Sequence, residues 1–265
     1  MSLQVVANFR VIDETDDWVV VDKPAPLIVH PANNKPEPTL LGGLGNLYSY
    51  EIENGACLGI ITRLDRETSG LVLVAKHTAA ARELGMIFER REARKEYLAI
   101  AKGWPVEDGW ICDARIIRGG EIGPTDIWVR QVVDDGGKEC STSFVVEDRF
   151  LRSGERFSLI RCFPETGRMH QIRVHLAASG HPIAGDKLYS GDGAEYLEWM
   201  EKGWTAGLAR KLVLPRHALH AARLGIVWQG LEIQWEARLA PDLADFISGK
   251  PVDFAEGVVN WCRKG

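Results

Sequence analysis

Short strand-like segments follow one another along this chain with few helices between them. Runs of hydrophobic and β-branched residues bounded by turn residues are typical of strands. A doubly wound parallel sheet needs a helix after nearly every strand, and the pattern here has too few. The order of segments therefore predicts an α+β fold around a mixed, mostly antiparallel sheet. The predicted strands are Trp18–Asp22, Leu27–His30, Leu58–Arg63, Leu71–Ala75, Tyr97–Ala101, Ile127–Val133, Ser143–Glu147, Phe157–Phe163, His220–Trp228 and Leu231–Arg238.

Helical spacing of apolar residues predicts a small number of helices. The clearest is His77–Arg91, and a second, Arg168–Ser179, ends at Gly180. Shorter helices are predicted at Glu195–Lys202 and Pro241–Ile247. The glycine-rich stretches Leu41–Gly45 and Gly119–Gly123 predict loops. Neither the dinucleotide-binding nor the P-loop glycine pattern is matched, so we expect no nucleotide cofactor.

The length and charge of the chain limit its class. With 265 residues and 45% hydrophobic residues it is long enough for one large core, and we expect a single domain over residues 1–265. The net charge of -5 excludes a polycationic nucleic-acid binder. It does not exclude RNA, because a local basic patch can oppose the total charge. The segment Thr205–Leu231 has basic residues and no acidic residue.

The sequence also indicates a compartment. No apolar run approaches the roughly 20 residues of a membrane helix, and the acidic amino terminus lacks the pattern of a signal peptide. The five cysteines are an odd number and form no C-x-x-C pair. We therefore expect buried free thiols, a cytoplasmic location and no membrane partner.

The segment Thr62–Gly70 is the most unusual in the chain. It places the carboxylate of Asp65 between Arg63 and Arg66, directly after a predicted strand. Flanking positive charge favours the ionised carboxylate, which suits a nucleophile. The alternative from the residues alone is a surface ion pair that stabilises a turn.

A second polar cluster lies in Pro164–Leu176. Thr166 and Gly167 are predicted to open a helix whose free N–H groups attract anions. Arg168 and Gln171 then share one helix face. Arg173 lies between this face and the apolar face, where it could reach a buried carboxylate. The alternative is an amphipathic helix with a solvated basic side. The histidines lack metal-ligand spacing, and we expect no metal site.

Six motifs together resemble the RluA-type family of RNA pseudouridine synthases. The chain departs from common family patterns at Thr62, often His, and at Pro26, often Gly. The resemblance implies the pseudouridine-synthase fold, with helices and loops flanking the sheet around a central cleft. It also implies isomerisation of uridine in ribosomal or transfer RNA without a cofactor, and we expect no amino-terminal S4-like domain. The motifs are VVDKPAPLIVHP (Val20–Pro31), RLDRETSG (Arg63–Gly70), KEYLA (Lys95–Ala99), TGRMHQIRVHL (Thr166–Leu176), HPIAGDKLY (His181–Tyr189) and LHA (Leu219–Ala221).

The resemblance also implies residue roles. Asp65 matches the catalytic aspartate, which acts on uracil C6 or ribose C1′ or stabilises the cation formed when the base detaches. Arg173 matches the arginine that pairs with this aspartate, and Tyr97 matches the tyrosine that stacks on the target base. Arg63 matches a position that contacts RNA. By position rather than by motif, we expect Arg168, Gln171 and the basic segment 205–225 to contact RNA as well.

Two other functions remain open at this point. One is a non-catalytic RNA-binding or RNA-folding factor with the same fold. The other is a hydrolase of a glycosidic bond, which usually needs a second carboxylate, and Glu67 is the near neighbour of Asp65 in sequence. We expect a monomer, since the motifs need no partner chain to complete them.

Overall fold

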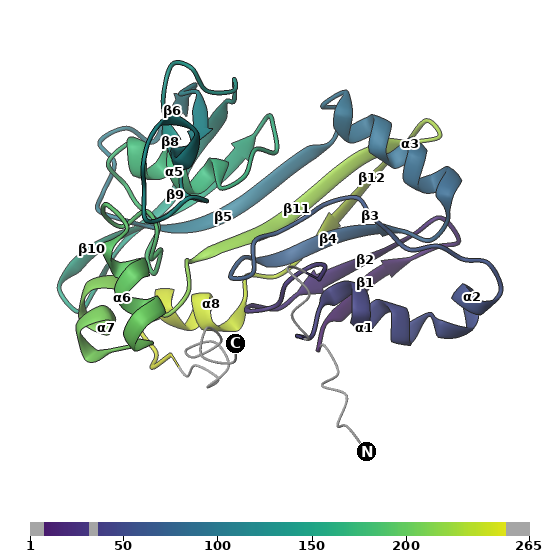
Figure 1. Ribbon diagram of the computed structural model, residues 1–265, viewed down its shortest axis with the longest axis horizontal. Helices are drawn as coiled ribbons and strands as arrows, with labels where there is room; N and C mark the ends of the chain where they lie inside the picture. The colour runs from purple at the N-terminus through teal and green to yellow at the C-terminus, as the bar shows by residue number, and fades with distance from the viewer. Residues whose placement is uncertain (1–7, 32–36, 253–265) are drawn as a thin grey trace. The chain divides into compact units, whose positions relative to one another are not determined.

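The structure is a computed structural model that describes residues 8–31 and 37–252, and it divides into two compact units (Figure 1). The first unit contains the described residues up to Arg94 together with Ala221–Ala240. The second contains Lys95–His220 together with residues 241–252. The predicted single catalytic domain over residues 1–265 stays a prediction.

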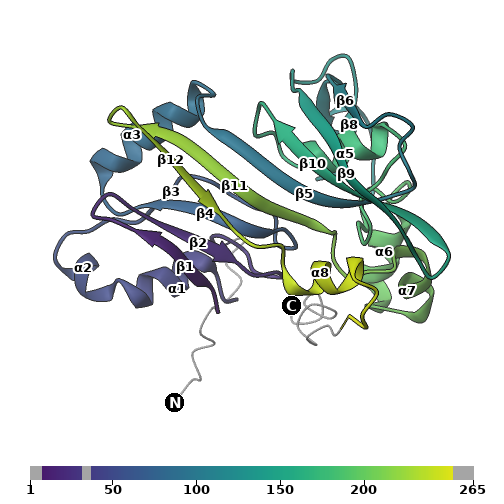
Figure 2. The ribbon, with the colours of Figure 1, turned by 180° about the vertical axis from the view of Figure 1, so that it is seen from behind.

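The first unit is built on antiparallel strands. β2 pairs with β1 on one side and with β4 on the other, and β12 pairs with β11, as Figure 2 shows from behind. β4 (SGLVLVA) is buried throughout, as expected for a continuous apolar run inside a sheet. The elements are β1 (Arg10–Glu14), β2 (Trp18–Lys23), α1 (Leu40–Leu47), α2 (Ser49–Glu53), β3 (Gly59–Ile60), β4 (Ser69–Ala75), α3 (Thr78–Glu89), β11 (Leu219–Trp228) and β12 (Leu231–Glu236).

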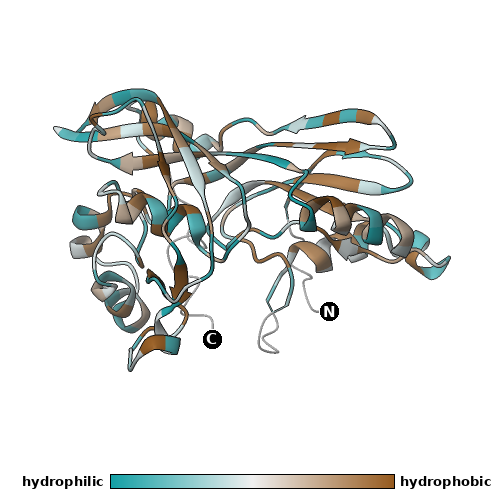
Figure 3. Cartoon of the chain, turned by 90° about the horizontal axis from the view of Figure 1, so that it is seen from above, coloured by the Kyte–Doolittle hydropathy of each residue, from teal (hydrophilic) through white to brown (hydrophobic). Residues whose placement is uncertain are grey.

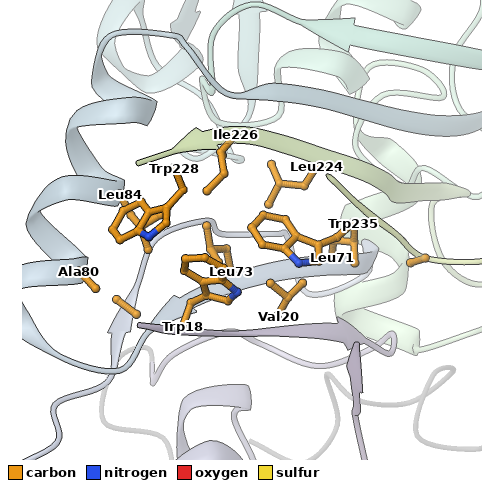
Figure 4. Packing of buried hydrophobic residues seen from close by; sticks show 12 residues of the cluster. Trp18, Val20, Leu71, Leu73, Ala80, Leu84, Leu224, Ile226, Trp228 and Trp235 are labelled. Atoms are coloured by element: carbon orange, nitrogen blue, oxygen red, sulfur yellow. The ribbon is translucent and has the colours of Figure 1, made fainter. Parts of the chain in front are cut away.

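Alternation along β2 and β4 gives this unit two cores, one on each face of the sheet. Val19 and Val21 pack with α1 in one cluster, whereas Val20 packs with α3 in the other. In the second cluster the indoles of Trp228 and Trp235 meet Trp18 edge to face, at centroid distances of 5.4 and 5.7 Å (Figure 4). These two clusters hold β3 and β4 in place, and the loop that carries Asp65 connects these two strands.

Asp13 accepts hydrogen bonds from the N–H groups of two of these indoles. Its Oδ2 accepts N–H bonds from Trp18 at 3.0 Å and from Trp235 at 2.6 Å. Burial raises the pKa of Asp13, but these hydrogen bonds and one from the backbone of Glu14 outweigh it, so the pKa lies below its usual value.

The second unit contains the antiparallel strand order β5-β10-β9-β6 and a separate β7–β8 hairpin. α6 and α7 pack together through Trp199, Leu208 and Leu212. The elements are β5 (Arg94–Lys102), β6 (Gly109–Cys112), β7 (Ile116–Arg118), α4 (Gly119–Ile122), β8 (Gln131–Val133), β9 (Thr142–Arg152), β10 (Glu155–Pro164), α5 (Gln171–Ala178), α6 (Ala194–Lys202), α7 (Ala206–Leu212) and α8 (Pro241–Ile247).

The predicted α+β class and the mostly antiparallel sheet are confirmed, but three predicted strands are wrong in extent. Leu27–His30 makes only an isolated bridge at Ile28. Leu58–Arg63 shortens to Gly59–Ile60, and Ile127–Val133 to Gln131–Val133, because a turn hydrogen bond from Arg130 N–H to Ile127 O precedes β8. Strands β1, β6 and β7 and helices α2 and α7 were not predicted.

Helix boundaries differ from the prediction where capping decides them. Leu41–Gly45, predicted as a loop, lies in α1, because Thr39 caps the helix by accepting the N–H of Gly42 and two leucines of α1 are buried. Gly119–Gly123, also predicted as a loop, includes the short helix α4. The helix predicted from Arg168 begins only at Gln171, after His170 at φ 58°.

Hydrophobic and hydrophilic residues are mixed along the strands and helices (Figure 3). Among the described residues, no helix has the length and apolar character needed to cross a membrane. The four cysteines in the described residues are free thiols, as predicted. Cys140 and Cys162 are buried, but Cys112 is half-buried and Cys57 is exposed, so the prediction of burial is wrong for these two. Cys262 lies outside the described residues.

Candidate active site residues

Asp65 lies in the loop of the first unit that joins β3 to β4. Its side chain is half-buried, and its carbonyl accepts the N–H of Thr68 at 3.1 Å, which closes a turn around it. Thr62 fixes the start of the loop, because its Oγ1 accepts the N–H of Leu73 in β4 at 2.9 Å. Arg63 is exposed. The loop thus holds Asp65 in a defined turn beside an exposed cation.

Lys23 anchors this loop from the end of β2. The lysine is buried, and its Nζ donates to the carbonyls of Pro24 at 3.0 Å, Leu27 at 2.8 Å and Arg66 at 3.2 Å. The carbonyl of Arg66 also accepts the N–H of Leu27 at 3.0 Å. A buried ammonium needs such acceptors to offset its lost hydration. Lys23 therefore holds the residue that follows Asp65.

The second arginine of the motif also holds the loop. Arg66 forms a two-pronged ion pair with Glu37, from Nη1 to Oε2 at 2.7 Å and from Nη2 to Oε1 at 2.8 Å. Such paired N–H···O bonds fix orientation as well as charge. The sequence interpretation gave Arg66 only an electrostatic effect on Asp65, and the structure adds this anchoring contact.

Tyr97 lies on β5 in the second unit, opposite Cys162 of β10. Its side chain is half-buried. Lys95, two residues earlier and so on the same strand face, donates to the carbonyl of Thr166 at 2.9 Å. This bond ties the segment before α5 to the strand that carries Tyr97.

Arg173 lies on α5 and binds a buried carboxylate, as its predicted place between the two helix faces suggested. The partner is Asp186, at 2.6 Å from Nε to Oδ2 and 2.9 Å from Nη2 to Oδ1. The two side chains are only 6% and 0% exposed. The pairing of Arg173 with Asp65 that the resemblance implies stays a prediction.

Gln171 is buried, and its amide bonds the segment before α5. Its Oε1 accepts the hydroxyl of Thr166 at 2.5 Å and the N–H of Arg168 at 3.1 Å. Its Nε2 donates to the carbonyl of Ser141 at 2.9 Å and to Thr142 Oγ1 at 3.0 Å. Arg168 is exposed and precedes the helix, so the predicted shared helix face is wrong.

His175 continues this buried network. Thr142 contacts its Nδ1 at 2.9 Å, and its Nε2 lies 2.9 Å from the carbonyl of Ala114, which can only accept. Nε2 therefore carries the proton, and Nδ1 accepts from the hydroxyl. Burial lowers the pKa of His175 despite the raising effects of the Ala114 hydrogen bond and Asp113. The imidazole is a neutral structural link.

Comparison with known proteins decides the family. Residues 17–178 match the family model described as RNA pseudouridylate synthase. The chain belongs to this family. Two curated relatives are named ribosomal large subunit pseudouridine synthase D: one from Nitrosomonas europaea, 36% identical over 237 residues, and one from Escherichia coli strain K12, 33% identical over 249 residues. The alignments cover 89% and 93% of this chain and 63% and 72% of the relatives. The resemblance found in the motifs is confirmed.

The chain spans about three fifths of the length of the Nitrosomonas relative and of a Neisseria meningitidis relative with the same name. Among solved structures, human RNA pseudouridylate synthase domain containing 1 aligns with a TM-score of 0.70 at 24% identity, covering 100% of this chain and 98% of that one. At 24% identity, this structural match supports the pseudouridine synthase fold alone.

Three residues near the candidate site were missed by the sequence reasoning. Lys23 lies in the VVDKPAPLIVHP motif, and Asp186 and Tyr189 lie in HPIAGDKLY, so the motifs contained them without indicating what they contact.

The basic segment 205–225 is less accessible than expected for an RNA contact. Arg216 is buried in an ion pair with Asp242, at 2.6 and 2.9 Å.

The remaining basic side chains of that segment are more exposed, but two of them have acidic partners. Arg223 pairs with Glu236 and Lys211 with Glu195. Within residues 8–31 and 37–252 no cluster of His, Cys, Asp or Glu suits a metal ion.

Proposed function

We propose that this chain isomerises uridine to pseudouridine in RNA. The N1–C1′ bond of a uridine breaks, the base turns, and a C5–C1′ bond forms. C5 then loses its hydrogen as a proton and N1 gains one, so the product has the same atoms as the substrate. The observation that carries this proposal is the family match over residues 17–178, which contains Asp65, Tyr97 and Arg173.

Asp65 is the proposed catalytic carboxylate. Charge developing at C1′ resembles an oxocarbenium ion, for which a carboxylate is the natural partner. Tyr97 is proposed to stack on the target base, and Arg173 to hold the catalytic carboxylate oriented. The target uridine must leave its stack, at a cost of a few kcal/mol that contacts elsewhere offset.

Exposed cations are the proposed source of those RNA contacts. Arg63 and Arg168 are both exposed, and their effect should weaken as salt rises. Gln171 was predicted to contact RNA, but its amide is engaged by four groups within the second unit. We assign it instead to positioning the backbone of Arg168.

We propose large-subunit ribosomal RNA as the substrate, because that is what the names of the curated relatives state for those proteins. Transfer RNA is the alternative substrate. We also propose that the chain acts as a monomer in the cytoplasm, where ribosomal RNA is assembled into ribosomes. The proposed reaction needs no nucleotide cofactor.

Tritium release from [5-³H]uridine-labelled RNA tests the reaction, because C5 loses its hydrogen only when the new bond forms. RNA from cells lacking the protein is separated into ribosomal and transfer RNA and given to wild type, Asp65→Ala, Asp65→Asn and the exposed-surface control Asp16→Asn. We expect release from ribosomal RNA by wild type and Asp16→Asn only. RNA affinity of the Asp65 variants should stay within about tenfold of wild type, or about 1.4 kcal/mol.

The other outcomes are distinct. Binding without release by wild type would favour the non-catalytic RNA-binding function, and free uracil would reveal a glycosidic hydrolase. Release from transfer RNA alone would replace the proposed substrate. Full release by both Asp65 variants would remove Asp65 from the mechanism.

A further inference from the structure

The buried carboxylate of Asp186 binds one edge of the Arg173 guanidinium and the backbone of its own loop. Oδ2 of Asp186 accepts the Nε–H of Arg173, and Oδ1 accepts an N–H of its Nη2. Oδ1 also accepts the N–H groups of Leu188 at 3.0 Å and Tyr189 at 3.2 Å. The position of the carboxylate is thus set by its own loop, so Arg173 adopts an orientation that the loop defines.

The same loop places the ring of Tyr189 so that the Arg173 guanidinium lies over the ring face. The carbon Cζ of Arg173 lies 5.0 Å from the ring centroid, and that of Arg130 lies 5.6 Å from it. Arg130 also donates to the carbonyls of Leu188 at 3.0 Å and Gly191 at 2.8 Å. The ring is therefore held by a residue that itself fixes the loop.

The hydroxyl of Tyr189 is fixed as well. It accepts the N–H of Gln131 at 2.9 Å and lies 2.8 Å from Nδ1 of His170. The hydroxyl thus contacts both the backbone of Gln131 and the imidazole of His170. These two contacts fix the position of the hydroxyl end of the ring.

Two contacts therefore constrain Arg173: the paired hydrogen bonds to Asp186 and the ring of Tyr189. A guanidinium has five N–H groups in a fixed fork, and Asp186 takes those at the Nε–Nη2 edge, which directs the Nη1 edge the opposite way. We propose that Asp186 and Tyr189 are positioning residues that hold Arg173 in one orientation for the isomerisation, an assignment that rests on the proposed function. They act on the reaction through Arg173.

The second unit contains a matched control. Arg216 and Asp242 form a two-pronged pair with the same atoms and the same distances, 2.6 and 2.9 Å. The experiment compares Asp186→Asn with Asp242→Asn, measuring kcat and KM for tritium release, RNA affinity and the urea midpoint. We expect Asp186→Asn to lower kcat by about 100-fold, the scale of a misplaced catalytic group. KM should stay within about threefold of wild type. Asp242→Asn should keep kcat within about threefold.

Conservative variants provide the rescue. Asp186→Glu keeps a carboxylate and should recover part of the lost kcat. Tyr189→Phe keeps the ring against the guanidinium and should lose less kcat than Tyr189→Leu, which removes it. These variants also serve if Asp186→Asn fails to fold. Equal kcat for Asp186→Asn and wild type, or equal losses for the Asp186 and Asp242 variants, would overturn the proposal.

A readout independent of activity follows the guanidinium itself. In ¹⁵N-labelled protein, the Nε–H resonance of Arg173, assigned by its loss in Arg173→Lys, should shift and exchange faster with water in Asp186→Asn but not in Asp242→Asn. An unchanged resonance in Asp186→Asn would refute the orientation. If wild type released no tritium, the proposed function would fail, whereas this resonance would still decide whether Asp186 orients Arg173.

Discussion

Gly70 ends the motif that carries Asp65, and its substitution gives the sharpest test of how the loop is held. Its φ of +108° is one that L side chains rarely adopt. A Cβ at this position would lie 2.2 Å from the carbonyl oxygen of Ala221 in β11 and 2.7 Å from its nitrogen. Both neighbours are backbone atoms, so no flexible side chain can move aside.

The expected cost of Gly70→Ala has two parts. A left-handed conformation costs an L residue roughly 1–2 kcal/mol. Overpacking against an immovable neighbour adds about 1–3 kcal/mol. We therefore expect the free energy of unfolding to fall by about 2–5 kcal/mol.

Gly55→Ala separates the two parts. Gly55 has a similar φ of +101°, but a Cβ there meets nothing within 4 Å. We expect this variant to lose only the conformational part, about 1–2 kcal/mol. Urea unfolding followed by tryptophan fluorescence measures both, since Trp18 lies in the core beside β4.

Activity gives a second readout of the same clash. The backbone must move by about 1 Å to relieve the contact, and a displacement of that size near reacting groups can cost about 100-fold in rate. Tritium release should fall in Gly70→Ala and not in Gly55→Ala. Equal losses of unfolding free energy in the two variants would refute the close-approach reasoning.

Two further perturbations test buried charges. Lys23→Met removes the ammonium that three carbonyls bind and should lower the free energy of unfolding by about 3 kcal/mol. The exposed pair of Lys250 with Asp245 predicts a loss of no more than about 1 kcal/mol for Lys250→Met, and a similar loss in both variants would contradict the anchoring role. Burial, with the nearby charges of Arg173, Lys187 and Arg216, lowers the pKa of His217 well below its usual value. Below pH of about 6.5 the unfolded imidazole gains a proton that the buried one does not, so wild type should lose up to about 1.4 kcal/mol per pH unit on acidification. His217→Gln should show a shallower dependence between pH 7.5 and 5.5 in chemical denaturation, and an unchanged slope would exclude this origin.

The strands and helices that the sequence predicted well are those whose patterns are set by burial. Trp18–Asp22 and His77–Arg91 were found because an apolar run and an apolar stripe are local properties of the sequence. Helix α1 was missed because its stability comes from the Thr39 cap and buried leucines, while its three glycines argued for a loop. Capping and tertiary packing overrode the local preference there.

In the candidate site, the motifs predicted which residues are functional but not which residues they contact. Arg173 was expected to reach a buried carboxylate, and the identity of Asp186 required the structure, because thirteen residues and a change of direction separate the two. Gln171 was interpreted as an RNA contact because exposed and buried amides look alike in a sequence. Only the packing of α5 shows that its side chain faces inward.

The anchors of the Asp65 loop meet at one strand pair. Lys23 lies opposite Gly70 in the β2–β4 register, so the residue that holds the middle of the loop is adjacent to the residue at its end. A strand pair buried on both faces resists local opening more than a loop does. The proposed isomerisation moves one glycosidic bond between two atoms of the same base, so it depends on where the reacting groups are held. Burial of the Lys23 ammonium costs hydration free energy, which its hydrogen bonds to backbone carbonyls offset. Because Lys23 lies at this strand pair, the same hydrogen bonds restrain the backbone beside Asp65.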